Sequence, residues 1–305
     1  MQETPLPNER FLYWFRRCVW LPSKLIFTPV ALLCIAYIVW LSRFDIVRLW
    51  VASNGAILVI ACLLLGAANF FSPLASRKIL QVLGINVEYR VLLRTHMLRL
   101  PARYLPGGVW HTIGRAIDLH EHGVNKPAIG WMVVLENGLA ICMAFLLGWG
   151  LLRFSGSMPK FYDGMTSLIA GAAVVILICL PALMRKLRRD TMLKLSVAKW
   201  TACCAWFAVI WALHAAAFVA YSMALVGNST VPEALHTGGV YLFSWGIGLV
   251  AFFAPQGIGV FEVTAAALAG QSLLPAAIAM VAGFRLCMLT VDLCLGLVGR
   301  LVVRR

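Results

Sequence analysis

The chain has 305 residues, of which 62% are hydrophobic and 12% charged, and its mean hydropathy is +0.87. This composition excludes a protein built from soluble domains and predicts an integral membrane protein. The formal net charge of +14 at pH 7 would suit a nucleic-acid binder, but the basic residues stand beside hydrophobic runs. We therefore expect no nucleic-acid partner, and we expect these residues to set the topology and to contact anionic lipid head groups.

Hydrophobic runs of membrane-crossing length recur along the chain. A hydrocarbon core of about 30 Å requires about 20 apolar residues per crossing. Six runs approach or exceed that length: Leu25–Leu41, Ala56–Ala75, Lys126–Leu152, Gly164–Pro181, Trp200–Val226 and Leu274–Val298. They predict an all-α polytopic helical bundle that forms one transmembrane domain over residues 1–305.

Two further hydrophobic segments, about 87–120 and 239–270, are interrupted by Pro/Gly breaks. Each consists of a short arm, a break and a second short arm, which predicts a re-entrant helical hairpin. The first hairpin follows a predicted span that ends in the cytoplasm, and the second follows one that ends outside. The two hairpins should therefore enter from opposite faces, as in an inverted repeat.

The orientation follows from the distribution of lysine and arginine. Basic residues cluster before the first run, after the second, between the fourth and fifth, and after the sixth, including Arg16, Arg17, Arg77, Lys78, Arg185, Lys186, Arg304 and Arg305. The positive-inside rule then places both termini in the cytoplasm of a multi-pass protein of the cell inner (plasma) membrane. The N-terminus lacks the pattern of a cleavable signal peptide.

The Pro/Gly breaks are the first candidates for a binding site. A helix that restarts at membrane depth directs unpaired N–H groups and its positive dipole end at the midplane, which favours a phosphate-like anion. The residues of the breaks that we assign to substrate binding are Pro106, Gly107, Gly108, Pro255, Gly257 and Gly259.

Ionisable residues within the hydrophobic segments are the second set of candidates. Glu136, Glu262, Arg285 and Asp292 lie near the expected midplane, where charges are costly unless paired or hydrated. We expect Glu262 to pair with Arg285, with Glu136 and Asp292 nearby. The pair is interpreted either as a structural lock between the second hairpin and the last span or as part of a substrate site.

Three basic residues surround the first break: Arg103, His111 and Arg115. They are interpreted as a basic path from the inner interface to the break, suited to an anionic head group. The alternative is that these side chains snorkel toward lipid phosphates.

The motif Pro255-Gln256-Gly257-Ile258-Gly259-Val260-Phe261-Glu262 resembles the Pro-x-Gly-(Ile/Leu)-Gly-x-x-Glu signature of the lysylphosphatidylglycerol synthase transmembrane-region family, which includes YbhN/AglD-like membrane proteins. Residues 104–110, followed by Gly114, Arg115 and Glu136, are similar to the family's other recurring block. One departure is Gln256, where the family often has glycine. The resemblance implies flippase-like lipid handling, without the synthase domain, which does not follow Arg305 in this sequence.

Three functions are compatible with these patterns. The first is a translocase for an anionic phospholipid or a polyprenyl-phosphate-linked lipid, with no cofactor. The second is an integral membrane enzyme with Glu136 or Glu262 as base, but no Asp-x-Asp, phosphate loop or nucleophile elbow occurs. The third is an accessory subunit that anchors a soluble or membrane biosynthetic enzyme through the basic segment 185–199.

Overall fold

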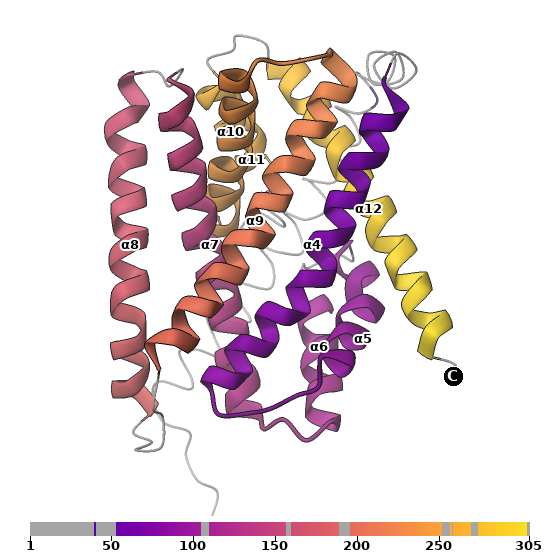
Figure 1. The fold of residues 1–305 in the computed structure, drawn as a ribbon, viewed down its shortest axis with the longest axis vertical. Helices are drawn as coiled ribbons and strands as arrows, with labels where there is room; N and C mark the ends of the chain where they lie inside the picture. The colour runs from indigo at the N-terminus through magenta and orange to yellow at the C-terminus, as the bar shows by residue number, and fades with distance from the viewer. Residues whose placement is uncertain are drawn as a thin grey trace, which may run out of the picture.

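The computed structural model describes residues 40, 53–104, 110–156, 160–188, 196–251, 257, 259–269 and 274–303. Within these ranges all regular secondary structure is helical, which confirms the predicted all-α class (Figure 1). The elements are α4 (Gly55–Val82), α5 (Tyr89–Arg99), the 3₁₀ helix η2 (Leu100–Tyr104), α6 (Trp110–Glu121), α7 (Lys126–Ser155), α8 (Lys160–Arg188), α9 (Val197–Val226), α10 (Val231–Val250), α11 (Val260–Leu268) and α12 (Leu274–Val303).

Five of the described helices are long and apolar enough to cross a membrane, so the chain is a multi-pass membrane protein. They are α4, α7, α9, Phe161–Lys186 of α8 and Ala279–Leu301 of α12. These helices confirm five of the six predicted spans. The remaining prediction, Leu25–Leu41, lies outside the described residues except for Trp40.

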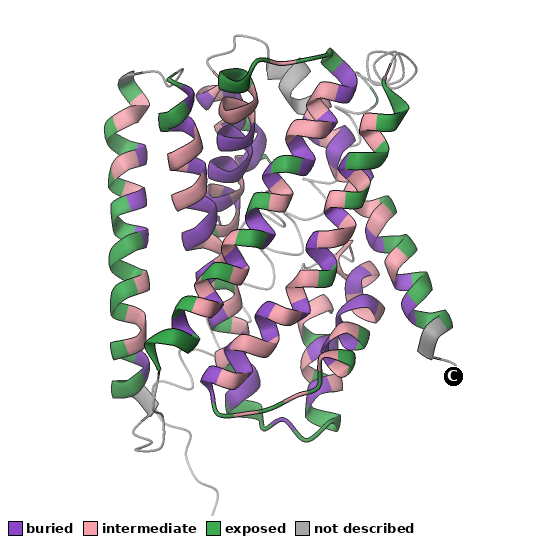
Figure 2. Ribbon diagram, in the orientation of Figure 1, coloured by how far each residue is buried: buried purple, intermediate pink, exposed green. Residues whose placement is uncertain are grey.

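Helix α8 lies at the edge of the bundle, and its outer face is exposed along its length (Figure 2). The exposed side chains are apolar: Phe161, Leu168 and Ile178 are 86%, 75% and 71% exposed. An apolar face of this length on a span-length helix is typical of contact with lipid. Most of the buried polar side chains of the described residues lie on other helices, including α4, α5, α6 and α12.

Side-chain caps set where several helices begin. Asn54 accepts a hydrogen bond from the Ala56 amide (3.1 Å) at the start of α4, and Asn125 accepts one from Ala128 (2.9 Å) at the start of α7. At the start of α10 the Thr230 amide donates to Glu233 Oε2 (2.8 Å), which lowers the pKa of the Glu233 carboxyl. Because of this cap, α10 begins eight residues before the predicted boundary at Gly239.

The two helical hairpins occupy opposite ends of the bundle. Helices α5 and α6 lie in the lower half of Figure 1, and α10 and α11 lie in the upper half. The first hairpin runs from Tyr89 to Glu121, close to the predicted 87–120. The breaks themselves, with Pro106, Gly107, Gly108 and Pro255, lie outside the described residues.

The helix contacts repeat in two halves, α4–α7 and α9–α12, with α8 between them. Helix α5 packs on α12 as α10 packs on α7, and α6 contacts α7 as α11 contacts α12. Likewise, α4 contacts both α7 and α12, and α9 contacts both α12 and α7, while α4 and α9 pack along each other. This exchange of partners, with hairpins at opposite ends, is the arrangement of an inverted repeat, as the sequence predicted.

Glycines permit the close approach of each hairpin to the span of the other half. A Cβ added at Gly148 of α7 would lie 2.7 Å from the Phe243 backbone nitrogen of α10, and one at Gly296 of α12 would lie 2.7 Å from Pro101 of η2. Each glycine lies 22 residues after the start of its helix: Gly148 after Lys126 in α7, and Gly296 after Leu274 in α12. The two halves therefore use glycine at the same position of the equivalent helix.

Candidate functional site

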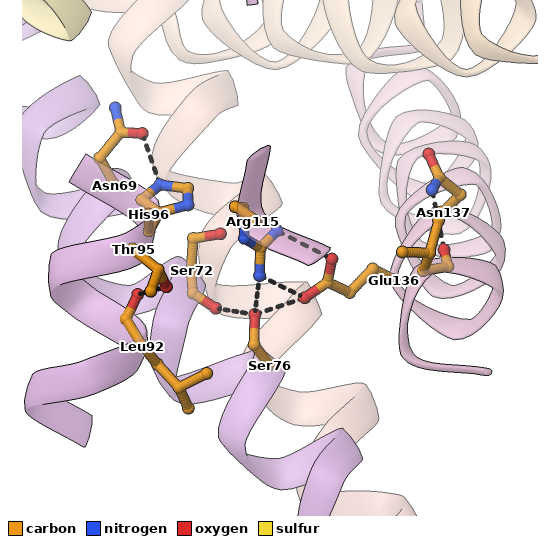
Figure 3. A network of polar contacts seen from close by, with 10 residues as sticks. Asn69, Ser72, Ser76, Leu92, Thr95, His96, Arg115, Glu136 and Asn137 are labelled. Atoms are coloured by element: carbon orange, nitrogen blue, oxygen red, sulfur yellow. Dashed lines mark hydrogen bonds and ion pairs between the residues drawn. The ribbon is translucent and has the colours of Figure 1, made fainter. Parts of the chain in front are cut away.

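Arg115 of α6 is buried against α7 and α4 (Figure 3). Its Nη1 and Nη2 donate to the two carboxylate oxygens of Glu136, each at 3.0 Å, and Nη2 also donates to the Ser76 hydroxyl at 3.0 Å. The Ser76 hydroxyl in turn contacts Glu136 Oε1. A bidentate guanidinium–carboxylate pair is geometrically specific, and because it is buried it is weakly screened by salt. The Arg115 guanidinium is therefore held inside the bundle by Glu136 and Ser76, instead of extending toward the surrounding lipid.

Asp292 of α12, only 2% exposed, is the centre of a second cluster. Its Oδ1 accepts a hydrogen bond from Asn69 Nδ2 of α4 (3.1 Å). Its Oδ2 accepts from Arg103 Nη1 (3.1 Å) and from the Tyr104 hydroxyl (2.9 Å), both from η2. Three donors from two other elements satisfy this buried carboxylate and hold the first hairpin against the last span.

Two histidines extend the second cluster toward α6. His96 Nε2 lies 3.2 Å from Asn69 Oδ1, as Figure 3 shows. The His96 and His111 rings pack edge to face with centroids 5.6 Å apart. Nδ1 of His96 and Nε2 of His111 are buried and have no hydrogen-bond partner among the described residues. Unsatisfied buried nitrogens are uncommon and mark places where a proton, a water or a ligand belongs.

Glu262 and Arg285 form the third cluster, in the second half. Arg285 Nη2 of α12 lies 3.1 Å from Glu262 Oε1 of α11, which confirms the predicted pairing. The Gly259 amide donates to Glu262 Oε2 at 2.7 Å, and the Arg285 guanidinium lies 5.7 Å from the centre of the Phe261 ring. The Glu262 carboxylate thus caps its own helix at the break while it pairs with the last span.

The three clusters are close enough to act on one another electrostatically. The charges of Arg103 and Arg115 both act on the His96 ring. The charges of Arg103 and Arg285 both act on the Tyr104 hydroxyl. Three arginines from η2, α6 and α12 therefore converge on one polar region, each beside a carboxylate. Such a region can bind an anion such as a phosphate when an arginine exchanges its carboxylate for the ligand's oxygens.

The structure gives a partner to two predicted residues for which the sequence predicted none. Glu136 and Asp292 were expected near the Glu262–Arg285 pair; Glu136 pairs with Arg115 and Asp292 with Arg103. The reason is that α6 packs on α7 and η2 packs on α12, so the first hairpin supplies a base to each of these acids.

The described glycines of the second break have a backbone role. Gly257 and Gly259 have φ angles of +66° and +86°, which residues with a side chain rarely adopt. A Cβ at Gly257 would lie 2.6 Å from the Gly248 Cα of α10, so this glycine also allows the break to pack against the hairpin's first arm. These glycines shape the turn that presents Glu262.

Sequence reasoning did not assign Asn69, Ser76, His96 and Tyr104 to the site. A signal was present for two of them, because Asn69 and Ser76 are polar residues seven positions apart within one hydrophobic span and therefore share a helix face. Among the described residues no cluster of three or more His, Cys, Asp or Glu side chains is arranged to hold a metal ion.

Comparison with known proteins gave no relative for this chain, since no protein-family model and no curated protein matches it.

Proposed function

We propose that this protein is a lipid translocase that handles an anionic phospholipid or a polyprenyl-phosphate-linked lipid. The observation that carries the proposal is the convergence of Arg103, Arg115 and Arg285 within a membrane bundle, each on a carboxylate and each at one of two hairpins that lie at opposite ends. Sites where two inverted repeats meet within a membrane bundle hold anionic substrate groups in transporters, which is the kind of ligand that three arginines favour.

The phosphate of the head group is the part of the lipid that this region fits. Guanidinium groups bind phosphate and carboxylate oxygens with the same bidentate geometry, so a phosphate competes directly with Glu136 for Arg115. Leaving one partner of a buried pair without compensation costs about 3–5 kcal/mol. The incoming anion therefore has to replace the carboxylate as the carboxylate becomes hydrated, which couples head-group binding to an opening of the site.

The inverted repeat supplies the two openings that translocation requires. Movement of the α5–α6 hairpin would expose the arginines to one face of the membrane, and movement of the α10–α11 hairpin would expose them to the other. The basic residues at the ends of α4, α8 and α12 gather at the end of the bundle that holds α5 and α6. We assign this end to the cytoplasm, and the membrane to the cell inner membrane.

The resemblance of residues 255–262 to the lysylphosphatidylglycerol synthase transmembrane-region signature supports the same function. Glu262 is the acidic residue of that signature, and it caps the restarting helix α11 and pairs with Arg285. We therefore propose membership of that family, with lipid movement as the shared activity.

The test is head-group accessibility in proteoliposomes, measured by one-sided quenching of fluorescent phosphatidylglycerol and fluorescent undecaprenyl phosphate. We expect movement of at least one lipid by the wild type, and an approximately tenfold or larger loss in Arg115→Gln. Arg99→Gln is the matched control, because Arg99 forms an ion pair with Asp118 between α5 and α6 but is 41% exposed. If neither lipid moves, the translocase is wrong and an enzyme or accessory subunit becomes the better explanation.

A second comparison separates a substrate site from a structural lock. Glu262→Ala and Arg285→Ala each remove one member of the pair between α11 and α12. If both single variants lose transport and the double variant regains it, the pair is a lock only. We expect no recovery in the double variant, because Arg285 is needed for the head group.

A further inference from the structure

A line of buried and half-buried polar side chains runs from α6 to α12 beside the arginines. It begins at His111, continues through the His96 ring and the Asn69 amide, and ends at the Asp292 carboxylate. Its three contacts are the 5.6 Å ring packing, a 3.2 Å hydrogen bond and a 3.1 Å hydrogen bond. Binding of an anion by the arginines does not itself require these residues.

The hydrogen-bond network assigns the tautomer of His96. Asn69 Nδ2 donates to the Leu65 carbonyl and to Asp292 Oδ1, each at 3.1 Å, so the other end of the amide is the carbonyl oxygen. That oxygen only accepts, and His96 Nε2 must therefore carry the proton that it donates. The lone pair of a neutral imidazole is then on Nδ1, the atom that is buried without a partner among the described residues.

The groups around His96 decide whether Nδ1 accepts a proton. Asn69 faces it from α4, Asp292 lies behind that amide on α12, and His111 packs against the ring from α6. Arg103 of η2 and Arg115 of α6 oppose a positive charge on the ring, and Glu136 of α7 pairs with Arg115. Two neighbouring cations and burial both oppose an imidazolium, so the ring stays neutral while no ligand is bound to the arginines.

An anion bound to the arginines reverses this balance. Glu136 and Asp292 stay in the region when an arginine exchanges its carboxylate for the ligand, so a phosphate at Arg103 and Arg115 adds a further negative charge and the repulsion on His96 falls. By linkage, a ligand that favours protonation of a group is itself bound more tightly when that group is protonated.

We propose that His96, with His111 beside it, is a proton-binding site that takes up a proton when an anionic head group occupies Arg103 and Arg115. The proton comes from the aqueous phase to which the site is open, adds to the Nδ1 lone pair to give an imidazolium, and leaves as the lipid leaves. Lipid and proton would then move together, and a proton gradient would drive the lipid. This inference rests on the proposed function, because it requires an anionic ligand at the arginines.

The probe is dihexanoyl phosphatidylglycerol, whose phosphodiester does not titrate near neutral pH, so any proton uptake belongs to the protein. Calorimetry of binding at pH 7 in two buffers with different ionisation enthalpies counts the protons taken up. We expect uptake approaching about one proton per lipid, and a Kd that decreases by up to about tenfold per unit decrease in pH. His96→Gln keeps a donor for Asn69 but has no titrating nitrogen, and it should bind the lipid without uptake.

The control is His122→Gln, because His122 is an exposed histidine just after α6 that bonds the Asp118 carbonyl and should leave uptake unchanged. Binding by the wild type without proton uptake, at a Kd independent of pH, would overturn the proton site and leave the translocase standing. Uptake that persists in a His96→Gln, His111→Gln double variant would overturn it as well. Absence of lipid binding by the wild type would overturn both proposals.

Discussion

The ion pairs of the two hairpins lie at equivalent positions, but the acid and the base are exchanged between hairpin and span. In the first half the base, Arg115, is on the hairpin and the acid, Glu136, is on the span; in the second half Glu262 is on the hairpin and Arg285 is on the span. Glu136 lies 10 residues into α7 and Arg285 lies 11 residues into α12. The repeat has therefore kept the location of the charge pair while exchanging its members.

The exchange of acid and base decides whether the arginine moves with its hairpin. Displacement of α6 takes Arg115 with it, whereas displacement of α11 leaves Arg285 on the long helix α12. The first pair is also more enclosed, with side-chain exposures of 8% and 16%, because Ser76 of α4 closes it. In the second pair the arginine is more exposed, since the side chain of Arg285 is 25% exposed. The arginine of the first pair is consequently less accessible to solvent than the arginine of the second.

The largest expected effect comes from breaking the enclosed pair. Arg115→Ala leaves Glu136 charged and buried, and the loss of stability should be about 3–5 kcal/mol. Arg285→Ala should cost distinctly less, because Glu262 keeps the hydrogen bond from the Gly259 amide and Arg285 is itself more exposed than Arg115. The apparent melting temperature in detergent, followed by tryptophan fluorescence, measures both variants. Equal losses, or a larger loss for Arg285→Ala, would contradict the difference in enclosure.

Exchanging the members of the first pair makes the first half resemble the second. The Arg115→Glu, Glu136→Arg double variant should recover most of the stability that either single variant loses, with a coupling energy of about 2–3 kcal/mol. Transport should nevertheless stay low, because the arginine now remains on α7 when the hairpin moves. A double-mutant cycle on melting temperature, combined with the proteoliposome assay, measures the two effects. Full recovery of transport would mean that it does not matter whether the arginine is on the hairpin or on the span.

The glycine contacts between the two halves should contribute less to stability than the ion pairs do. Gly148→Ala directs a methyl group at the Phe243 backbone, which has little freedom to move, and should cost about 1–3 kcal/mol. Gly296→Ala directs it at the ring of Pro101 in the short helix η2, which shifts more readily, and should cost less. Gly150→Ala is the control on α7, since a Cβ there meets nothing within 4 Å among the described residues. A greater loss for Gly296→Ala than for Gly148→Ala would be the opposite of this expectation.

Much of this comparison was accessible from the sequence, and some of it was not. The long helices follow from runs of apolar residues, and the Glu262–Arg285 pair follows from two charges at one depth in neighbouring segments. The partner of Glu136, Arg115, does not follow from the sequence. It depends on the packing of α6 against α7, and depth in the membrane does not predict that packing. Asn69 and His96 were missed for a related reason: a polar residue in a span predicts a partner but does not identify it.

The smallest effect should come from an exposed ion pair beside the repeat. Arg153 of α7 and Asp163 of α8 lie 2.8 Å apart with side chains 52% and 40% exposed, and α8 lies between the two described halves. Exposed pairs contribute about 0–1 kcal/mol, because solvent solvates both partners when they separate. Arg153→Gln should therefore leave the melting temperature and lipid movement nearly unchanged. If it destabilises the protein as much as Arg285→Ala does, then enclosure does not distinguish the ion pairs of this bundle, and the contrast between its two hairpins loses its physical basis.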